Sequence, residues 1–132
     1  MLVVDAANVV GSVPDGWWRD RSGAADRLIA RIAGLSATGV PADSLGLPEH
    51  TWYPEWVAVV EGQARGAGAG AAGVEVVAAA ASGDDTIAAE TARLVSSGRT
   101  VSVVTSDREL AGRATDAGAA VHGTRWLLDL LG

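Results

Sequence analysis

The sequence predicts an α/β fold, a three-layer α/β/α sandwich built on a mostly parallel five-stranded sheet. Three observations lead to this fold class. Short runs rich in β-branched residues recur along the chain, and most of them are apolar at consecutive positions, which is typical of strands covered on both faces. Stretches with helical spacing separate these runs, and such alternation favours parallel strands joined by helical crossovers.

The predicted strands lie at residues 2–4, 56–60, 74–77, 101–104 and, least distinctly, 119–121. Residues 36–55 show no period, so an irregular excursion is expected there. Residues 66–73 form a loop rich in glycine and alanine. It spells the dinucleotide-binding pattern, but a strand follows where that fingerprint requires a helix, so no dinucleotide site is predicted.

Helical spacing accounts for the remaining segments. One predicted helix carries Leu28, Ile32 and Leu35 on one face, and a second is defined by an apolar stripe from Ile87 to Val95. Residues 106–109 match a capping box that would open a third helix, with Ser106 as the cap and Glu109 as its partner. Thr124 is expected to cap a last helix.

Composition limits the classes of protein that fit. With 132 residues and 48% hydrophobic content, residues 1–132 are expected to form one domain. The basic residues are ten arginines without a lysine, which excludes phosphate-loop NTPases, Schiff-base enzymes and two-component receivers. There is no cysteine and no apolar run near the ~18 residues of a membrane span, so a cytoplasmic protein without membrane contact is predicted. The net charge of −6 argues against binding nucleic acid through overall charge, so the distribution of charge matters more.

Acidic residues follow four of the predicted strands, after the point where each strand ends. They are Asp5, Glu61, Asp84, Asp85 and Asp107. Four of them, Glu61, Asp84, Asp85 and Asp107, have an ordinary structural explanation as a helix cap, a first-turn acid or a solvated loop residue. Asp5 is the exception, because it directly continues an apolar strand. Since the carboxyl ends of parallel strands meet at one edge, we expect these carboxylates to converge and repel one another unless a cation neutralises them.

The donor chemistry of this cluster selects the cation. Neither His50 nor His122 lies in the acidic motifs, and oxygen ligands alone favour Mg²⁺ or Mn²⁺ over zinc. Asn8 supplies a neutral amide that could orient a metal-bound water. Glu61 is expected to act behind the residues that touch the metal.

Residues 3–8, 82–87 and 103–110 resemble the three acidic motifs of PIN-like, and particularly NYN-type, nucleases, in the same order. The resemblance implies a sheet of order 3-2-1-4-5 and one or two Mg²⁺ or Mn²⁺ ions that serve RNA cleavage. It assigns metal binding to Asp5, Asp85 and Asp107, with Asp84 as the substitute for Asp85, and catalysis to these residues with Asn8. Many relatives carry a fourth acid shortly after the third. Only Glu109 is near that position here.

Aromatic and basic residues in the loop after the first strand are candidates for RNA contact. Trp17 and Trp18 could stack on bases, and Arg19 and Arg21 could bind phosphates. Residues 13–16 would turn the chain there, and the third motif adds two further substrate-binding candidates, Ser106 and Arg108.

The predicted function is metal-dependent hydrolysis of RNA, single-stranded or structured, by an endoribonuclease. Two alternatives stay open. One is a phosphatase or nucleotide pyrophosphohydrolase that uses the same cation, although Ala7 replaces the second aspartate expected of haloacid-dehalogenase-type phosphatases. The other is a PIN-like module that binds RNA or protein without turnover. A homodimer is compatible with the sequence, and a toxin-like role would imply a protein inhibitor.

Overall fold

The computed structural model describes residues 1–13, 16–41, 51–64, 66, 68, 72–80 and 83–132. Its main sheet is five-stranded and entirely parallel, with the order β5-β4-β1-β6-β7. The strands, in chain order, are β1 (Leu2–Asp5), β4 (Trp56–Val60), β5 (Val74–Ala78), β6 (Ser102–Val104) and β7 (Ala120–His122). Numbered along the chain, this is the order 3-2-1-4-5, so the predicted fold class and strand order are confirmed.

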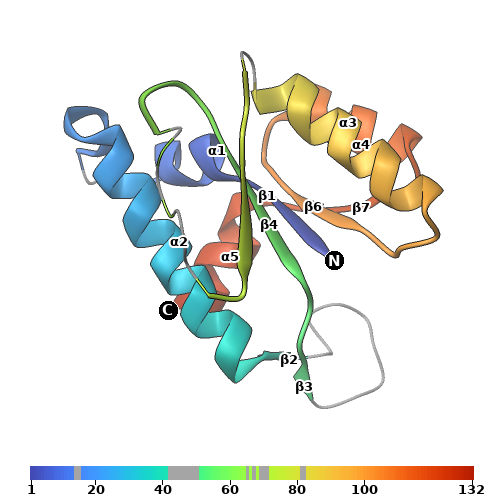
Figure 1. The fold of residues 1–132 in the computed structure, drawn as a ribbon, viewed down its shortest axis with the longest axis horizontal. Helices are drawn as coiled ribbons and strands as arrows, with labels where there is room; N and C mark the ends of the chain where they lie inside the picture. The colour runs from blue at the N-terminus through green and yellow to red at the C-terminus, as the bar shows by residue number, and fades with distance from the viewer. Residues whose placement is uncertain (14–15, 42–50, 65, 67, 69–71, 81–82) are drawn as a thin grey trace.

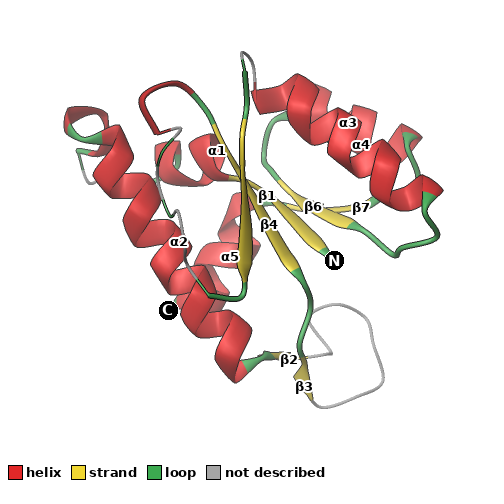
Figure 2. Ribbon diagram, viewed as in Figure 1, coloured by secondary structure: helices red, strands yellow, loops and turns green. Residues whose placement is uncertain are grey.

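Helices cover both faces of this sheet (Figures 1 and 2). One face is covered by α1 (Ala6–Gly11), α2 (Arg21–Thr38) and α5 (Thr124–Leu131), and the other by α3 (Gly83–Ser96) and α4 (Arg108–Asp116). Two short 3₁₀ helices follow α1 and β4, namely η1 (Trp17–Arg19) and η3 (Gly62–Ala64). The sequence pattern missed α1, because a helix of six residues has too few turns to show a period.

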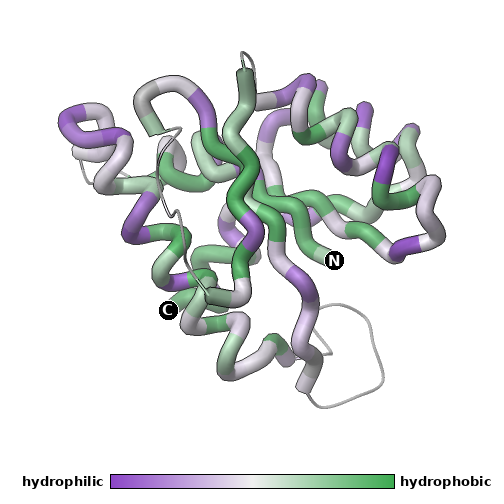
Figure 3. The backbone as a smooth tube through the Cα atoms, in the orientation of Figure 1, coloured by the Kyte–Doolittle hydropathy of each residue, from purple (hydrophilic) through white to green (hydrophobic). Residues whose placement is uncertain are grey.

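Alternate positions of each central strand pack into different cores. In β1, Leu2 and Val4 join α1, α2 and α5, whereas Val3 faces α3 and α4 together with Val57 and Val103. All of these side chains are buried, which explains why the strands are apolar at consecutive positions. Figure 3 shows the same continuity as a hydrophobic band through the central strands.

Two predicted helix caps are wrong by one residue. The side chain of Asp107, not Ser106, caps α4 by accepting a hydrogen bond of 3.1 Å from the backbone N–H of Leu110. Gly123, not Thr124, precedes α5, and Ser106 Oγ accepts from the backbone N–H of Thr124 at 2.9 Å. The capping box with Glu109 therefore does not form.

The segment predicted to be irregular has some regular structure. Its start continues α2 to Thr38, and β2 (Val40–Pro41) pairs antiparallel with β3 (Thr51–Trp52). Residues 42–50 lie outside the described residues, as do parts of the glycine-rich loop and of the turn at 13–16. Within the described ranges, no helix combines the length and apolar character that crossing a bilayer requires.

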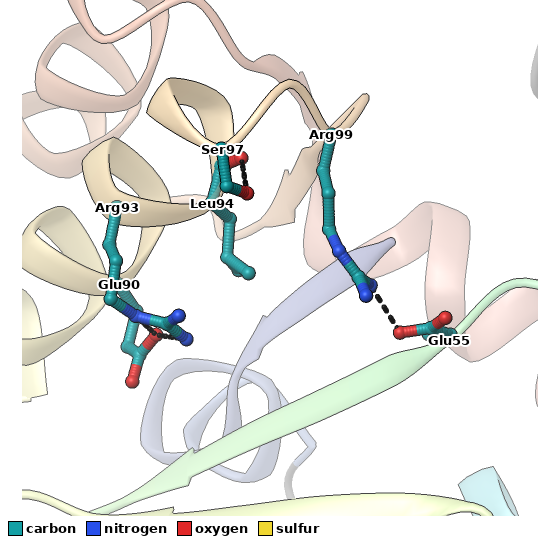
Figure 4. A network of polar contacts seen from close by, with 6 residues as sticks. All are labelled: Glu55, Glu90, Arg93, Leu94, Ser97 and Arg99. Carbon is teal, nitrogen blue, oxygen red and sulfur yellow. Dashed lines mark hydrogen bonds and ion pairs between the residues drawn. The ribbon is translucent and has the colours of Figure 1, made fainter.

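Polar contacts connect segments at the amino-terminal ends of the strands, opposite the strand ends that carry the acids. Arg99, after α3, forms an ion pair with Glu55, just before β4 (Figure 4). Ser97 Oγ donates to the carbonyl of Leu94 at 2.7 Å and closes the end of α3. The amino group of Met1 donates to the carbonyl of Thr100 at 2.9 Å. These contacts link the start of β1, the start of β4 and the segment after α3 at the edge opposite the acids.

Candidate functional site

Asp5 is a buried carboxylate at the junction of β1 and α1. Its side chain is 6% exposed, and it caps α1 by accepting from the backbone N–H of Asn8 at 3.3 Å. Burial raises the pKa of Asp5 to about 6, and the charges of Asp84 and Glu61 push it in the same direction. Hydrogen bonds from Thr105 and Asn8 oppose this rise. The prediction that Asp5 is more than a solvated residue is consistent with this environment.

Asp84 is the acid of the adjacent pair that interacts with the other carboxylates. Its pKa is raised, first by desolvation and then by the charges of Asp107 and Glu61. Asp85 instead forms an ion pair of 3.1 Å with Arg113, and its side chain is 78% exposed. Of the two residues, Asp84 interacts electrostatically with the other acids, whereas the resemblance assigned metal binding to Asp85.

The position of Asp84 follows from the buried stripe of α3. The described stripe runs through Ile87, Thr91 and Leu94, which are buried. Position 84 continues it backwards by one helical turn, whereas position 85 points about 100° away. This periodic signal was available in the sequence and could have separated the two residues.

Glu61 connects the end of β4 to the start of α3. One of its carboxylate oxygens, Oε2, accepts a hydrogen bond from the backbone N–H of Gly83, the first residue of α3. A carboxylate is stabilised at this end of a helix by the unpaired N–H groups and the helix dipole. Gly83 is needed for this approach, because a Cβ there would lie 2.5 Å from Glu61 Oε2. Glu61 therefore fixes the start of α3, the helix that carries Asp84. Its predicted role behind the metal-binding residues stays a prediction.

Thr105 links Asp5 to the start of α4. Its hydroxyl donates to Asp5 Oδ2 at 3.0 Å, and Thr105 Oγ1 itself accepts a hydrogen bond from the backbone N–H of Asp107 at 3.1 Å. Thr105 is only 2% exposed. Thr105 was not among the residues predicted for the site, although a polar side chain directly after the run at 101–104 was a signal for it.

Asn8 and Ser106 hold two loops together at the same edge. Asn8 Oδ1 accepts from the backbone N–H of Ser106 at 2.7 Å, which ties α1 to the segment after β6. The hydroxyl of Ser106 lies 3.0 Å from Thr124 Oγ1 and is used within the fold. Both residues lie at the predicted edge, but these contacts give them positioning roles and lend no support to substrate binding by Ser106.

Glu109 belongs to the acidic surroundings of Asp84. Its charge contributes to the raised pKa of Asp84, after those of Asp107 and Glu61. Since Asp107 caps α4 by itself, Glu109 is not engaged in a capping box. The predicted capping box, which placed the cap of α4 one residue too early, had assigned Glu109 to the cap.

We use the term acidic edge for five carboxylates at the carboxyl ends of the strands, namely Asp5, Glu61, Asp84, Asp107 and Glu109. Their donor chemistry suits a hard divalent cation, because all donors are carboxylate oxygens and several repel one another. Nevertheless, within the described ranges, no three carboxylate or imidazole side chains lie close enough together to form a ready-made ligand set. The edge fits Mg²⁺ or Mn²⁺ in chemistry, and side chains would have to draw together around the ion.

The predicted RNA-contacting residues divide into two arginine–tryptophan pairs. Arg21 lies over the ring of Trp17, with its guanidinium carbon 5.4 Å from the ring centre, and Arg19 lies 5.9 Å from the ring centre of Trp18. Trp17 is half-buried, whereas Trp18 is 55% exposed. Arg108 is exposed at the first turn of α4, next to Asp107. The first pair faces a cavity described below.

Comparison with solved structures identifies similar folds. A crystal structure of a tryptophan-to-leucine mutant of Rae1 (YacP) from Bacillus subtilis superposes with a TM-score of 0.71 and 21% sequence identity, over 98% of this chain and 73% of that chain. A second structure of Rae1 (YacP) from Bacillus subtilis gives 0.69 and 20%, over 99% and 72%. At this identity the likeness shows the fold. No protein-family model matches the chain, and no curated protein matches it in sequence.

Proposed function

We propose that this chain is a Mg²⁺- or Mn²⁺-dependent endoribonuclease that hydrolyses RNA phosphodiester bonds at the acidic edge, as its resemblance to PIN-like and NYN nucleases implies. One observation carries the proposal. Carboxylates that follow separate strands interact electrostatically at a single edge, and one of them, Asp5, is buried with a raised pKa. Clustered acids with perturbed pKa values are typical of functional sites.

The proposed site lies where ligands bind in folds of this kind. The chain leaves β1 toward β4 on one side and leaves β6 toward β7 on the other, so the strand order reverses between β1 and β6. Open α/β sheets bind ligands beyond the carboxyl ends of the strands at this reversal. Asp5 and Asp107 flank it, which supports placing the reaction there.

Asp5, Asp84 and Asp107 would hold the cation, and a bound divalent ion lowers the pKa of a coordinated water and stabilises negative charge on a phosphate. The chain's own residues prepare this site in two ways. Thr105 orients the Asp5 carboxylate through its hydroxyl group, and Glu61 fixes the start of α3, which carries Asp84. Glu109 supplies a fourth acid near Asp84, so the proposal includes one or two ions.

The lack of a ready-made ligand group among the described residues favours a second candidate, a PIN-like module that binds RNA without turnover. Cleavage of a mixed RNA panel, compared in EDTA, Mg²⁺ and Mn²⁺, tests the two against each other. Internal cleavage that requires metal and is lost in Asp5→Asn supports the endoribonuclease. RNA binding without products supports the binding module, and release of phosphate from nucleotides alone would point to a phosphatase or pyrophosphohydrolase.

A matched variant controls for the loss of one negative charge. Asp116 ends α4, at the far end of the helix from the acidic edge, and it is exposed. Asp116→Asn should keep full activity. Equal losses in Asp5→Asn and Asp116→Asn would contradict the assignment of the reaction to the acidic edge.

A further inference from the structure

A cavity of about 500 Å³ opens beside the acidic edge. Small apolar residues, among them Ala6, Val10 and Val60, form much of its wall. The ring of Trp17 forms another part, and the polar groups include Arg21 and Glu61. Ligand pockets of proteins have about this size and the same combination of apolar walls with a few polar groups.

The cavity lies next to Asp5 both in the chain and in the sheet. Ala6 directly follows Asp5, and β4, which contributes Val60, pairs with β1 in a register that sets Asp5 opposite Val59. The ends of α1 and α2 and the segment after β4 converge on this side of the sheet (Figure 1). A ligand in the cavity would therefore extend toward the acidic edge.

The charges in the wall indicate what the cavity can accept. Arg21 and Glu61 carry opposite charges, so their sum does not attract an ion of either sign. A phosphate would be repelled by Glu61, and a hydrocarbon would displace water from both charged groups without offering either of them a hydrogen bond. A flat, neutral ring with donors and acceptors on its rim satisfies the aromatic wall and both polar groups. Nucleobases have this chemistry, and unpaired bases of RNA are commonly bound by stacking on aromatic rings.

We propose that this cavity binds one unpaired nucleobase of the RNA, stacked against Trp17 with its polar rim toward Arg21 and Glu61. The neighbouring phosphate then lies at the acidic edge. This inference rests on the proposed ribonuclease function, to which it adds a preference for single-stranded RNA and a base-binding subsite. Trp18 and Arg19, which do not line the cavity, contribute less to binding.

The two arginine–tryptophan pairs provide matched variants for a binding test. Fluorescence anisotropy with labelled single-stranded RNA in EDTA measures affinity without requiring cleavage. Trp17→Ala should weaken binding roughly 5- to 150-fold, the range for loss of one base-stacking ring. Trp18→Ala should weaken it less. Equal losses in both variants, or no RNA binding by the wild type in EDTA, would overturn the proposal.

Abasic RNA tests whether Trp17 contacts a base rather than the backbone. A set of oligonucleotides carries one abasic position, moved stepwise along the strand. At one position, the missing base should lower the RNA affinity of the wild type as much as Trp17→Ala does. The same abasic RNA should not lower the affinity of Trp17→Ala further, because that variant already lacks the ring on which the base stacks. A penalty that persists undiminished in Trp17→Ala would overturn the assignment.

A cavity-filling variant keeps the test decisive if Trp17→Ala fails to fold. Ala7 lines the cavity and is exposed on α1, so Ala7→Leu would project a larger side chain into it, whereas Ala30→Leu adds the same group to an exposed position of α2. Ala7→Leu should weaken binding at least 5-fold and Ala30→Leu should not. RNA affinity of Ala7→Leu equal to that of Ala30→Leu overturns the cavity assignment. If the variants change RNA binding as expected but the wild type shows no metal-dependent cleavage, the base-binding cavity stands and only the proposed ribonuclease function is overturned.

Discussion

Thr105 Oγ1 donates a hydrogen bond of 3.0 Å to Asp5 Oδ2, and the two residues are 100 positions apart in the chain. Both side chains are buried at the carboxyl edge of the sheet. The same threonine oxygen accepts a hydrogen bond from the backbone N–H of Asp107, so one hydroxyl group links the end of β1 to the segment after β6. This contact makes the relative position of Asp5 and Asp107 a property of the fold.

Thr105→Val should raise the pKa of Asp5 further above its value of about 6, because the hydrogen bond from Thr105 stabilises the charged carboxylate. The free energy of unfolding should fall by about 1–3 kcal/mol, since a buried acceptor and a backbone donor lose their partner. NMR titration of the Asp5 carboxyl and urea unfolding measure the two effects. Thr105→Ser keeps the hydroxyl and should restore both values, whereas an unchanged Asp5 pKa in the valine variant would contradict the role of this hydrogen bond.

Asp5→Asn should change how stability depends on pH. Burial raises the pKa of Asp5 from 3.8 to about 6 in the folded protein, so the unfolded chain loses this proton at lower pH than the folded one. The contribution of Asp5 to stability therefore falls as pH rises from about 4 to about 6, and stays reduced above. Without metal, the asparagine variant should gain about 3 kcal/mol relative to wild type between pH 3.5 and pH 7.5. Urea unfolding in EDTA across this range measures the difference, and a wild type that gains stability relative to the variant as pH rises would contradict the expectation.

Asp84→Asn and Asp85→Asn should differ in metal response. Asp84 interacts with the other acids of the edge, so its variant should lose most of the thermal stabilisation that Mn²⁺ gives the wild type, together with RNA cleavage. Asp85 is exposed and paired with Arg113, so its variant should keep both and change stability by less than about 1 kcal/mol. Thermal melts with EDTA and with Mn²⁺ compare the two. The reverse result would restore Asp85 as the metal-binding residue.

Gly83→Ala should destabilise the protein by about 1–3 kcal/mol, because the added Cβ would lie 2.5 Å from Glu61 Oε2 and would displace that carboxylate. Gly34→Ala is the matched control, since a Cβ at that position in α2 meets nothing within 4 Å. It should stabilise the protein by about 0.5–1 kcal/mol through helix propensity. Urea unfolding distinguishes the pair. Stabilisation of both variants would show that the contact between Glu61 and Gly83 is not needed.

Hydrophobic patterning was enough to predict the architecture. Strands apolar at consecutive positions, such as Trp56–Val60, require cover on both faces, and this requirement leads to a parallel sheet between two helical layers. The same reasoning placed Asp5, Glu61 and Asp107 at one edge, because the end of a parallel strand is visible in the sequence as the point where the apolar run stops. The helix period also contained the choice of Asp84 over Asp85, although the resemblance pointed to the other residue.

Only the tertiary structure decided which side chains act together. Whether Ser106 or Asp107 caps α4 is a difference of one residue, and it determines whether Glu109 is held in a capping box or contributes to the acidic edge. The link between Thr105 and Asp5 and the division of the two arginine–tryptophan pairs depend in the same way on packing between distant segments. Apolar patterning reports the local period of the chain. Hydrogen bonds and cavities depend on how closely side chains from distant elements approach one another, and no local pattern specifies that distance.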